Sequence, residues 1–582
     1  MKNYNVSPEI VVSNKADGAW EGYENIHKAI LKAVTKSGKE KSVLTIECYP
    51  GVNYEELEQS LIFPLKASKI VHSDELALKE DAIQQLIEKN LTDDRVFGLQ
   101  SSHQLQDFFS GEAILKVRDD IKNIQEGLVI VYGVGARLVC EPDVLIYADL
   151  TRWEIQRRFS EEGLSNWKAD NSDEELLRKY KRGYFVEWRV ADKHKKKLFG
   201  SIDFLLDTNL KMIPKMITAE NFRVGMKQAT QQPFRLVPYF APGIWGGQWM
   251  KEQFGLNESE ENYAWSFDGV PEENSVQLAY GDVRVSIPSM NIVFQHPREL
   301  LGEGVHARFG DEFPIRFDLL DTMGGQNLSL QVHPITEYIQ EHFGMHYTQD
   351  ESYYLLDAKE DAVVYLGTKN KVNKEEMLED LYEANDGHKD FPDDKYINKY
   401  PAKKHDHFLI PAGTIHCSGA NSMVLEISAT PYIFTFKLWD WGRLGLDGLP
   451  RPVHLEHGKE VIQWERNTEW VEKNLINQVE QIDSGDGWIE ERTGLHEREF
   501  IETRRHWFSK KVHHHTGGSV NVLNLVEGEE AVVESPDNAF TPFVVHYAET
   551  FIIPCSVKEY TIRPYGEAEG KTIVTVKASV RI

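Results

Sequence analysis

Strand-length runs separated by turn residues make up most of the chain beyond about residue 230, and they limit the folds open to it. Gly, Pro, Asp and Asn stand between the runs, and charged helical segments interrupt them near residues 336–346 and 372–386. The runs fall within residues 312–335, 351–367, 405–428 and 432–441, with more after about residue 485. Many short strands at close spacing are typical of a sandwich or barrel, so we predict two related jelly rolls, the first with a helical insert.

The first 225 residues or so have a different pattern, in which apolar runs alternate with helical stretches. Strands are predicted at KSVLTIECY (41–49), EGLVIVYGVGA (126–136) and PDVLIYADL (142–150), and helices at 74–91 and 151–163. Strands that alternate with helices favour an α/β unit with a parallel sheet. Together with the jelly rolls, this pattern predicts domains at 1–225, 226–480 and 481–582.

The N-terminal unit weakly resembles a uridine-kinase-like P-loop fold. Strand 41–49 is followed by a glycine turn and a helix, but the G-x-x-x-x-G-K-[ST] signature is missing. The lysine that binds phosphates and the hydroxyl that binds magnesium are therefore both missing from this position. Arg157 and Arg158 are interpreted as ordinary helix charges. We expect a degenerate, inactive kinase-like domain that serves as a scaffold or in dimerisation.

Charge and composition argue against several classes of protein. The 582 residues contain 92 Asp and Glu against 65 Lys and Arg, a formal net charge of −27. Nucleic acids and anionic membranes need clustered cations, so neither is an expected partner, whereas a small phosphorylated ligand needs only a local cation. No signal peptide and no apolar run of about 18 residues is found, and the four cysteines are widely separated. We expect a soluble, cytoplasmic protein with reduced thiols, whose oligomeric state stays open.

One set of polar residues predicts chemistry. In the strand NLSLQVHP (327–334), Ser329, Gln331 and His333 share a face because side chains alternate along a strand. Glu351 lies on the next predicted strand, and His416 ends the turn segment P-A-G-T-I-H. This order is that of the metal site in cupin jelly rolls. Two imidazoles, one carboxylate and one amide suit Zn2+, and a single carboxylate leaves the cation a useful Lewis acid.

From about residue 236 onwards the chain resembles class I mannose-6-phosphate isomerases, zinc-dependent enzymes with two cupin domains and a helical insert. The resemblance lies in GIWGGQWM (243–250), FPIRFDLLDTMGGQNLSLQVHP (313–334), IPAGTIH (410–416), TFKLWDWGR (435–443) and VLNLVEGEEAVV (522–533). It implies a sugar phosphate substrate and interconversion of mannose 6-phosphate and fructose 6-phosphate through an enediol-type proton transfer.

The resemblance also implies roles for particular residues. The family's zinc ligands fall on Gln331, His333, Glu351 and His416. Glu426 matches an acidic residue of the active site, Ser329 matches a serine of the substrate site, and Lys437 takes the place of an arginine. These three are the predicted catalytic residues.

Three positions depart from the family pattern. Gln349 and Asp318 stand where the family has lysines, and Lys437 lacks the two-pronged geometry of arginine. Arg316, Arg443 and Arg451 are candidates to restore the positive charge, or are ordinary surface or packing arginines. A rival hypothesis is therefore a metal-bearing cupin that binds a sugar or sugar phosphate for sensing or scaffolding without turnover. A bifunctional kinase and isomerase is a third, weaker one.

The remaining histidines and cysteines are predicted to lie outside the metal site. His405 and His407 precede the turn, and Cys417 alternates with His416 and so points away from the metal. The consecutive residues 513–515 are predicted to form the rim of a sheet, because alternating strand faces keep them from meeting at one ion.

Overall fold

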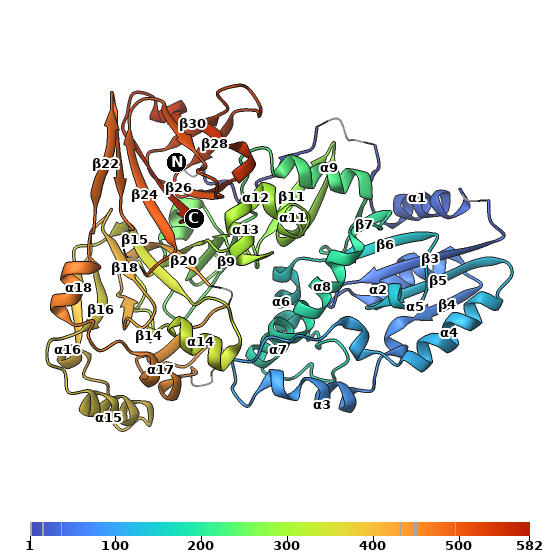
Figure 1. Cartoon of the computed structure of the whole chain (residues 1–582), viewed down its shortest axis with the longest axis horizontal. Coiled ribbons are helices and arrows are strands. Elements are labelled where there is room, and N and C mark those ends of the chain that lie inside the picture. The colour runs from blue at the N-terminus through green and yellow to red at the C-terminus, as the bar shows by residue number, and fades with distance from the viewer. Residues whose placement is uncertain are drawn as a thin grey trace. The chain divides into compact units, whose positions relative to one another are not determined.

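The chain forms two compact units in the computed structural model (Figure 1). The structure describes residues 3–13, 17–36, 38–430, 432–446, 448, 451–494, 496 and 498–582. The α/β unit comprises Glu9–Gln228 and Ser275–Gln295. The β unit comprises Met1–Pro8, Ala229–Asn274 and His296–Ile582. Among the described residues, no helix combines the length and the apolarity needed to cross a membrane.

The α/β unit is built on one seven-stranded sheet with the order β2-β8-β7-β6-β3-β5-β4. Its strands are β2 (Ala19–Glu21), β3 (Lys41–Cys48), β4 (Lys69–His72), β5 (Gly127–Gly133), β6 (Val144–Asp149), β7 (Phe204–Asp207) and β8 (Lys215–Thr218). The five strands from β4 to β7 in this order pair in parallel, which confirms the predicted parallel sheet. The kinase likeness of the unit stays a prediction.

Helices connect these strands and turn apolar stripes toward the core. They are α1 (Tyr23–Thr35), α2 (Tyr54–Leu57), α3 (Glu80–Leu91), α4 (Gly111–Asn123), α5 (Ala136–Val139), α6 (Arg152–Glu161), α7 (Leu176–Arg182), α8 (Trp188–Leu198) and α9 (Ala219–Ala229). In α1 the buried residues Ile26, Ile30 and Val34 are four apart and therefore share one face. Ser110 and Thr151 cap α4 and α6 by accepting backbone N–H bonds.

A later segment of the chain completes the α/β unit. It holds β11 (Ser275–Tyr280), β12 (Val283–Pro288) and α11 (Met290–Gln295), and β11 pairs in parallel with β1 (Ile10–Val11). Asp207 at the end of β7 accepts the backbone N–H of Ser286 at 2.8 Å. Residues 275–295 lie within the predicted domain 226–480 but belong to the α/β unit. Pairing with a strand more than 260 residues earlier leaves no local signal in the sequence. The other predicted boundaries stay predictions.

The first β domain is a cupin-like sandwich of two sheets, with the orders β18-β15-β20-β13-β10-β9 and β17-β16-β19-β14-β21. Its strands are β9 (Tyr239–Ala241), β10 (Trp265–Gly269), β13 (Arg316–Asp321), β14 (Leu330–Val332), β15 (Asp350–Ala358), β16 (Val363–Thr368), β17 (Ile397–Pro401), β18 (His407–Ile410), β19 (His416–Ser418), β20 (Ser422–Ala429) and β21 (Phe436–Trp439). These strands confirm the predicted strand-rich segments, and β17 is one that the sequence analysis did not predict.

Several helices accompany this sandwich. They are α10 (Trp249–Phe254), α12 (Pro297–Leu301), α13 (Glu303–Phe309), α14 (Thr336–Phe343), α15 (Lys374–Asn385), α16 (Asp393–Tyr396), α17 (Leu455–Val461) and α18 (Thr468–Asn474). The helices α14 and α15 confirm the two predicted helical inserts. Asn373 caps α15 by accepting the backbone N–H of Glu376.

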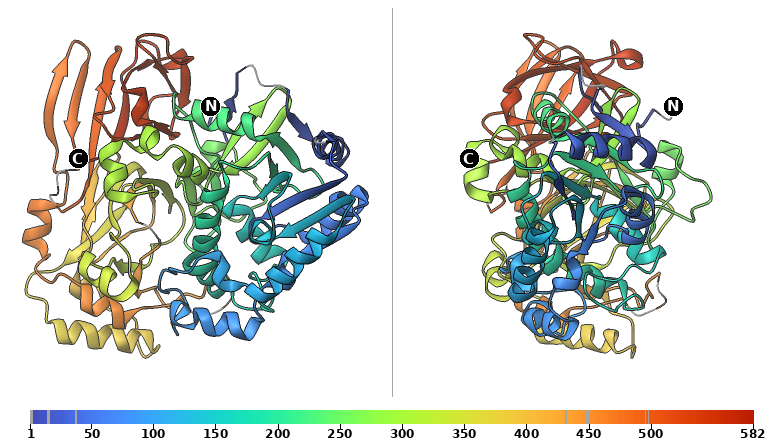
Figure 2. Two further views of the ribbon diagram at one scale, coloured as in Figure 1. Left: turned by 45° about the vertical axis from the view of Figure 1, so that its right-hand side comes forward. Right: turned by 90° about the vertical axis from the view of Figure 1, so that its right-hand side faces the viewer.

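The second β domain also pairs two sheets, β22-β23-β24-β31-β26-β29 and β25-β30-β27-β28. Its strands are β22 (Glu480–Gly485), β23 (Trp488–Arg492), β24 (Ile501–Phe508), β25 (Val512–His515), β26 (Asn521–Glu527), β27 (Glu530–Glu534), β28 (Phe543–His546), β29 (Thr550–Ile553), β30 (Glu559–Pro564) and β31 (Ile573–Val580). Long neighbouring strands of this domain stand in orange at the left of the first view in Figure 2. Leu523, Phe551 and Ile562 belong to the apolar cluster that fills its interior.

Candidate metal centre

The four predicted metal ligands converge between the two sheets of the first β domain. His333 Nε2 lies 3.0 Å from Glu351 Oε2, and His416 Nε2 lies 2.7 Å from Glu351 Oε1. The side-chain nitrogen of Gln331 lies 3.2 Å from His416 Nε2. The two histidines and the glutamate are fully buried. Residues 85 positions apart in the chain thus meet at one point inside the sandwich.

Strand pairing explains this convergence. Gln331 on β14 stands directly opposite His416 on the neighbouring antiparallel strand β19. On its other side Gln331 pairs with Lys437 of β21, so Lys437 shares the face of the sheet that carries Gln331. Glu351 comes from β15 of the facing sheet. His333 follows β14 directly and reaches the same carboxylate.

Backbone carbonyls orient both imidazole rings. His333 Nδ1 lies 2.9 Å from the carbonyl oxygen of Phe434, and His416 Nδ1 lies 2.8 Å from that of Thr414. A carbonyl oxygen can only accept, so each Nδ1 carries a proton, and in the neutral ring each Nε2 has a lone pair that points toward Glu351. The Nε2 of His333 has no hydrogen-bond partner among the described residues. Such anchoring by the second ring nitrogen is the usual arrangement of metal-ligating histidines.

The donor set fits a divalent cation. Ligand atoms of His333, Glu351 and His416 all lie within 4.8 Å of one another. Around a tetrahedral ion with bonds of about 2.1 Å, neighbouring ligand atoms are about 3.4 Å apart, close to the separations above. Two lone pairs and a carboxylate aimed at one buried point repel each other unless a cation lies between them. Turning the Gln331 amide over would bring its oxygen, a better metal donor, to the same place.

Charge interactions within this set shift its pKa values. Burial raises the pKa of Glu351, but the two neighbouring histidines outweigh burial and hold it well below its usual range. Burial lowers the pKa of His333, yet the Glu351 carboxylate raises it more, so its pKa lies above the ordinary value. Both directions arise from the attraction between the buried Glu351 carboxylate and the His333 ring, since each favours the charged form of the other.

Two further carboxylates share the face of the sheet that carries Glu351. Asp318 on β13 pairs with Glu426 on β20, and Glu426 pairs with Tyr353 on β15. Glu351 is two residues before Tyr353 on the same strand, so all four side chains point toward the metal site. Burial raises the pKa of Asp318 to about 8 and that of Glu426 well above its usual range, and the neighbouring Asp318 carboxylate raises the pKa of Glu426 further.

Tyr353 is a site residue that the sequence analysis missed. Its side chain is fully buried, and its ring centroid lies 5.8 Å from that of His416. The signal was its position two residues beyond Glu351 on a strand. Gln349, one of the predicted departures from the family pattern, donates to Glu351 Oε2 at 2.9 Å and thereby fixes that carboxylate.

Ser329 belongs to a separate polar cluster. It donates to Asp440 Oδ1 at 2.9 Å, and Asp440 also pairs with Arg443 and with Arg451, the latter at 2.6 Å. Arg316 is buried on the face of β13 that carries Asp318, with its Nε 4.0 Å from Glu272. The two arginines on Asp440 are thus held in place by a carboxylate, and their surroundings are those of packed residues.

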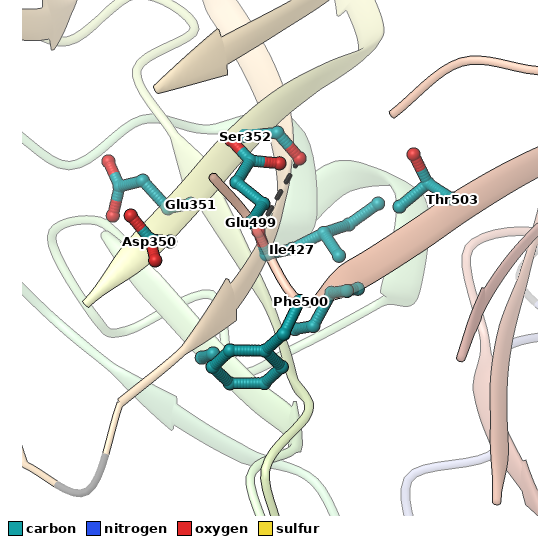
Figure 3. Close-up of a pocket in the computed structure, with 9 residues that line it drawn as sticks. Asp350, Glu351, Ser352, Ile427, Glu499, Phe500 and Thr503 are labelled. Carbon is teal, nitrogen blue, oxygen red and sulfur yellow. Dashed lines mark hydrogen bonds between the residues drawn. The ribbon is translucent and has the colours of Figure 1, made fainter. Parts of the chain in front are cut away.

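The opposite face of β15, away from the metal site, borders a small cavity, shown in Figure 3. Asp350 and Ser352 alternate with Glu351 along the strand and face the second β domain, where Glu499 and Thr503 contribute to the lining. The cavity holds about 10 Å³, enough for about one water molecule. A sugar phosphate therefore has no access to Glu351 from this side.

The other histidines lie where the sequence analysis put them, with one exception. His405 Nδ1 and the hydroxyl of Tyr354 share a hydrogen bond of 2.9 Å. His407 stands opposite Tyr354 in the strand pairing, on the face of β15 that points away from Glu351. Strand β25 is the edge of its sheet, as predicted for residues 513–515. Only His513 and His515 are exposed, however, while His514 points into the domain interior because side chains alternate along the strand.

Comparisons with known proteins find one domain family and one group of named relatives. Residues 22–231 match the model of a domain of unknown function, DUF8485. The chain is 28% identical over 236 residues to mannose-6-phosphate isomerase ManA of Bacillus subtilis, which covers 40% of this chain and 69% of that protein. It is 30% identical over 233 residues to mannose-6-phosphate isomerase of Streptococcus mutans, which covers 40% of this chain and 68% of that protein.

A crystal structure of the mannose 6-phosphate isomerase from Bacillus subtilis aligns with a TM-score of 0.48 at 20% identity, covering 60% of this chain and 99% of that chain. The sequence match to the streptococcal protein spans more than two thirds of its length at 30% identity. Over this part of its length, the chain therefore belongs to the mannose-6-phosphate isomerase family.

Proposed function

We propose that this protein is a zinc-dependent aldose–ketose isomerase that interconverts mannose 6-phosphate and fructose 6-phosphate, or a closely related pair. The observation that carries the proposal is the meeting of two carbonyl-anchored imidazoles with Glu351 at one buried point. Family membership supports the reaction class, since the matched relatives are named for that activity. Gln331, His333, Glu351 and His416 would hold the ion.

Each part of the reaction has a candidate residue. Zinc, when bound, stabilises negative charge that develops on the sugar oxygens. Glu426 is proposed to take the proton from carbon 2 of the aldose and to deliver it to carbon 1, while the hydroxyl proton passes from oxygen 2 to oxygen 1, since Glu426 lies on the same face as Glu351. Lys437 is proposed to attract the anionic substrate, because it stands beside Gln331 on the neighbouring strand. Ser329 is proposed to contact the substrate from the Asp440 cluster.

A phosphate group needs a cation near the site. Arg443 and Arg451 are the nearest candidates along the chain to Lys437, and both pair with Asp440. An incoming phosphate would have to compete with that carboxylate for the guanidinium groups. This competition predicts a higher KM than a site with unpaired arginines would give.

The proposal is tested by following fructose 6-phosphate formation with a coupled assay. Zinc-loaded protein should turn over mannose 6-phosphate, and a chelator should abolish the activity until zinc is returned. Absence of turnover in protein that holds one zinc per chain would overturn the proposal.

The second candidate function is binding of a sugar or sugar phosphate without isomerisation, for sensing or scaffolding. It is favoured by Asp318, which places a second buried carboxylate directly opposite Glu426. The pKa of Asp318 is about 8, so above that pH its carboxylate adds negative charge that repels a dianionic substrate. Saturable binding of mannose 6-phosphate without exchange of its carbon-2 proton for solvent deuterium would favour this function over the first.

We further propose that the α/β unit is a kinase-like scaffold without phosphoryl-transfer activity, in a cytoplasmic protein with reduced thiols. At the carboxyl end of β6, the place where such sheets bind ligands, Lys195 pairs with Asp149 at 2.9 Å. Asn291 bonds to both of these side chains. A buried lysine that is already paired does not replace a phosphate-binding lysine. Measurable ATP hydrolysis by the purified chain would contradict this part.

A further inference from the structure

A second and larger cavity lies in the β unit, and no predicted metal ligand lines it. Its volume is about 470 Å³. Its walls come from α10, the end of β15, the turn between β26 and β27, and the N-terminal residues Asn3 and Tyr4. Pockets for small molecules usually have volumes of about 300–1,000 Å³, so the cavity is large enough for a ligand with one or two sugar rings.

Aromatic rings form the buried part of the lining. Tyr4 stacks on Phe254 with ring centroids 3.9 Å apart, and Trp249 meets Phe254 edge to face at 5.6 Å. Tyr547 of the second β domain stands edge to face with Trp249 at 6.0 Å and is half-buried. Rings fixed in this way offer apolar surface against which the C–H groups of a ligand can pack at low entropic cost.

Carboxylates dominate the charged part of the lining. Four acidic residues stand against two lysines: Asp357, Glu527, Glu529 and Glu567 against Lys404 and Lys571. Each lysine already pairs with one of these glutamates, Lys404 with Glu527 and Lys571 with Glu529 at 2.7 Å. The imidazole of His546 also lines the cavity and bonds to Glu549 at 3.2 Å.

The excess of negative charge in the lining restricts the kind of ligand that the cavity can bind. Asp357 and Glu567 are left without a lysine, so the lining carries more negative than positive charge. A phosphate dianion would be repelled here. Hydroxyl groups, by contrast, donate well to carboxylates, and such hydrogen bonds to a charged acceptor are about twice as strong as neutral ones. Asp357 also accepts from Trp249 Nε1 at 2.9 Å, which aligns the carboxylate with the ring.

We propose that this cavity is a second, non-catalytic binding site for an unphosphorylated carbohydrate. Its aromatic floor packs against a sugar ring, and its carboxylates accept the sugar hydroxyls. The site differs from the metal centre in position and in ligand class, since the centre is proposed to take a sugar phosphate. Sugar binding in this cavity does not depend on turnover at the metal centre.

The test is calorimetric titration of the full-length, chelator-treated chain, so that the metal centre does not contribute. Mannose, a mannose disaccharide and mannose 6-phosphate serve as probes. An unphosphorylated sugar should bind, and mannose 6-phosphate should bind at least tenfold more weakly. Tyr547→Ala and Asp357→Asn should each weaken binding of the unphosphorylated sugar about tenfold or more. Glu559→Gln, at an exposed position outside the cavity, should leave it unchanged.

Asp357→Asn keeps the shape of the side chain and its acceptor for Trp249, so it tests the charge without disturbing the fold. Thermal melting of each variant checks that it is folded. The proposal is overturned if neither unphosphorylated sugar binds, if both cavity variants bind as the parent does, or if mannose 6-phosphate binds the metal-free chain as tightly as the neutral sugars.

Discussion

The two β domains of this protein have the same architecture and very different interiors. In the first, polar side chains of both sheets meet at Glu351, and each histidine ring is anchored through Nδ1. In the second, the corresponding space is filled by an apolar cluster that includes Leu525, Val533 and Phe551. The strands of both domains alternate in the same way. The choice of inward-facing residues, and not the sandwich itself, therefore separates a candidate reaction centre from a packed core.

Polar residues are also buried in the second domain, but they are not arranged to share an ion. His506 Nε2 pairs with Glu490 at 3.0 Å, and His514 stacks against Tyr560. Neither belongs to a group that could hold a metal among the described residues. Buried histidines alone therefore do not make a metal site; their free nitrogens must point at one place.

The largest effect is expected from removing a metal ligand. His416→Ala should lower turnover by at least about 10³-fold and reduce bound zinc to a small fraction of one per chain, because one imidazole donor is lost from a site with few ligands. Coupled assay and elemental analysis measure both. His514→Ala is the matched control in the second domain and should retain activity and zinc. Equal losses of activity and zinc in the two variants would contradict the assignment of the metal site to the first β domain.

A smaller effect is expected at the proposed proton-transfer residue. Glu426→Gln should lower kcat by about 10²- to 10⁴-fold while zinc content stays at the parent level, since an amide cannot accept the carbon-2 proton. Parent-like kcat would remove Glu426 from the mechanism. Asp318→Asn sharpens the result above pH 8, where Asp318 is ionised, because relief of like-charge repulsion should there lower the KM for the sugar phosphate.

A substitution in the core of the second domain should lower the stability of the protein without changing zinc binding. Leu525→Ala removes a fully buried side chain and should lower the free energy of unfolding by about 2–5 kcal/mol. Denaturant titration measures the loss, and zinc content below the unfolding transition should not change. Loss of zinc from the folded variant would mean that the two interiors are coupled.

The smallest effect concerns pH. Burial lowers the pKa of Lys577 in the second domain to about 8. Between about pH 8 and pH 10 the folded chain therefore binds fewer protons than the unfolded chain, so stability should rise with pH by about 2 kcal/mol. Lys577→Met should flatten this rise in melting experiments at pH 8 and pH 10. An unchanged rise in the variant would assign it to another group.

The sequence was most informative where spacing along the chain determines position in space. The pattern Gln331-x-His333 and the turn before His416 predicted residues that meet in the structure, because alternation and a short turn are local properties. The sequence did not predict Tyr353 as a site residue or the pairing of Asp318 with Glu426. The sequence of one strand alone does not determine which residues of its neighbour stand opposite it. Alternation was predicted for residues 513–515, but not the burial of His514, because the edge position of the strand does not show that one of its faces covers a core.

The segment 275–295 has a consequence for how the chain is made. Asp149, Lys195 and Asn291 form one buried network, and the last of them comes almost 100 residues after the second. On the ribosome, the α/β unit is therefore left with a lysine and an aspartate that lack their amide neighbour until part of the β unit has already emerged. A gene fragment that stops near residue 230 would encode an unfinished domain, and its behaviour would say little about the whole protein.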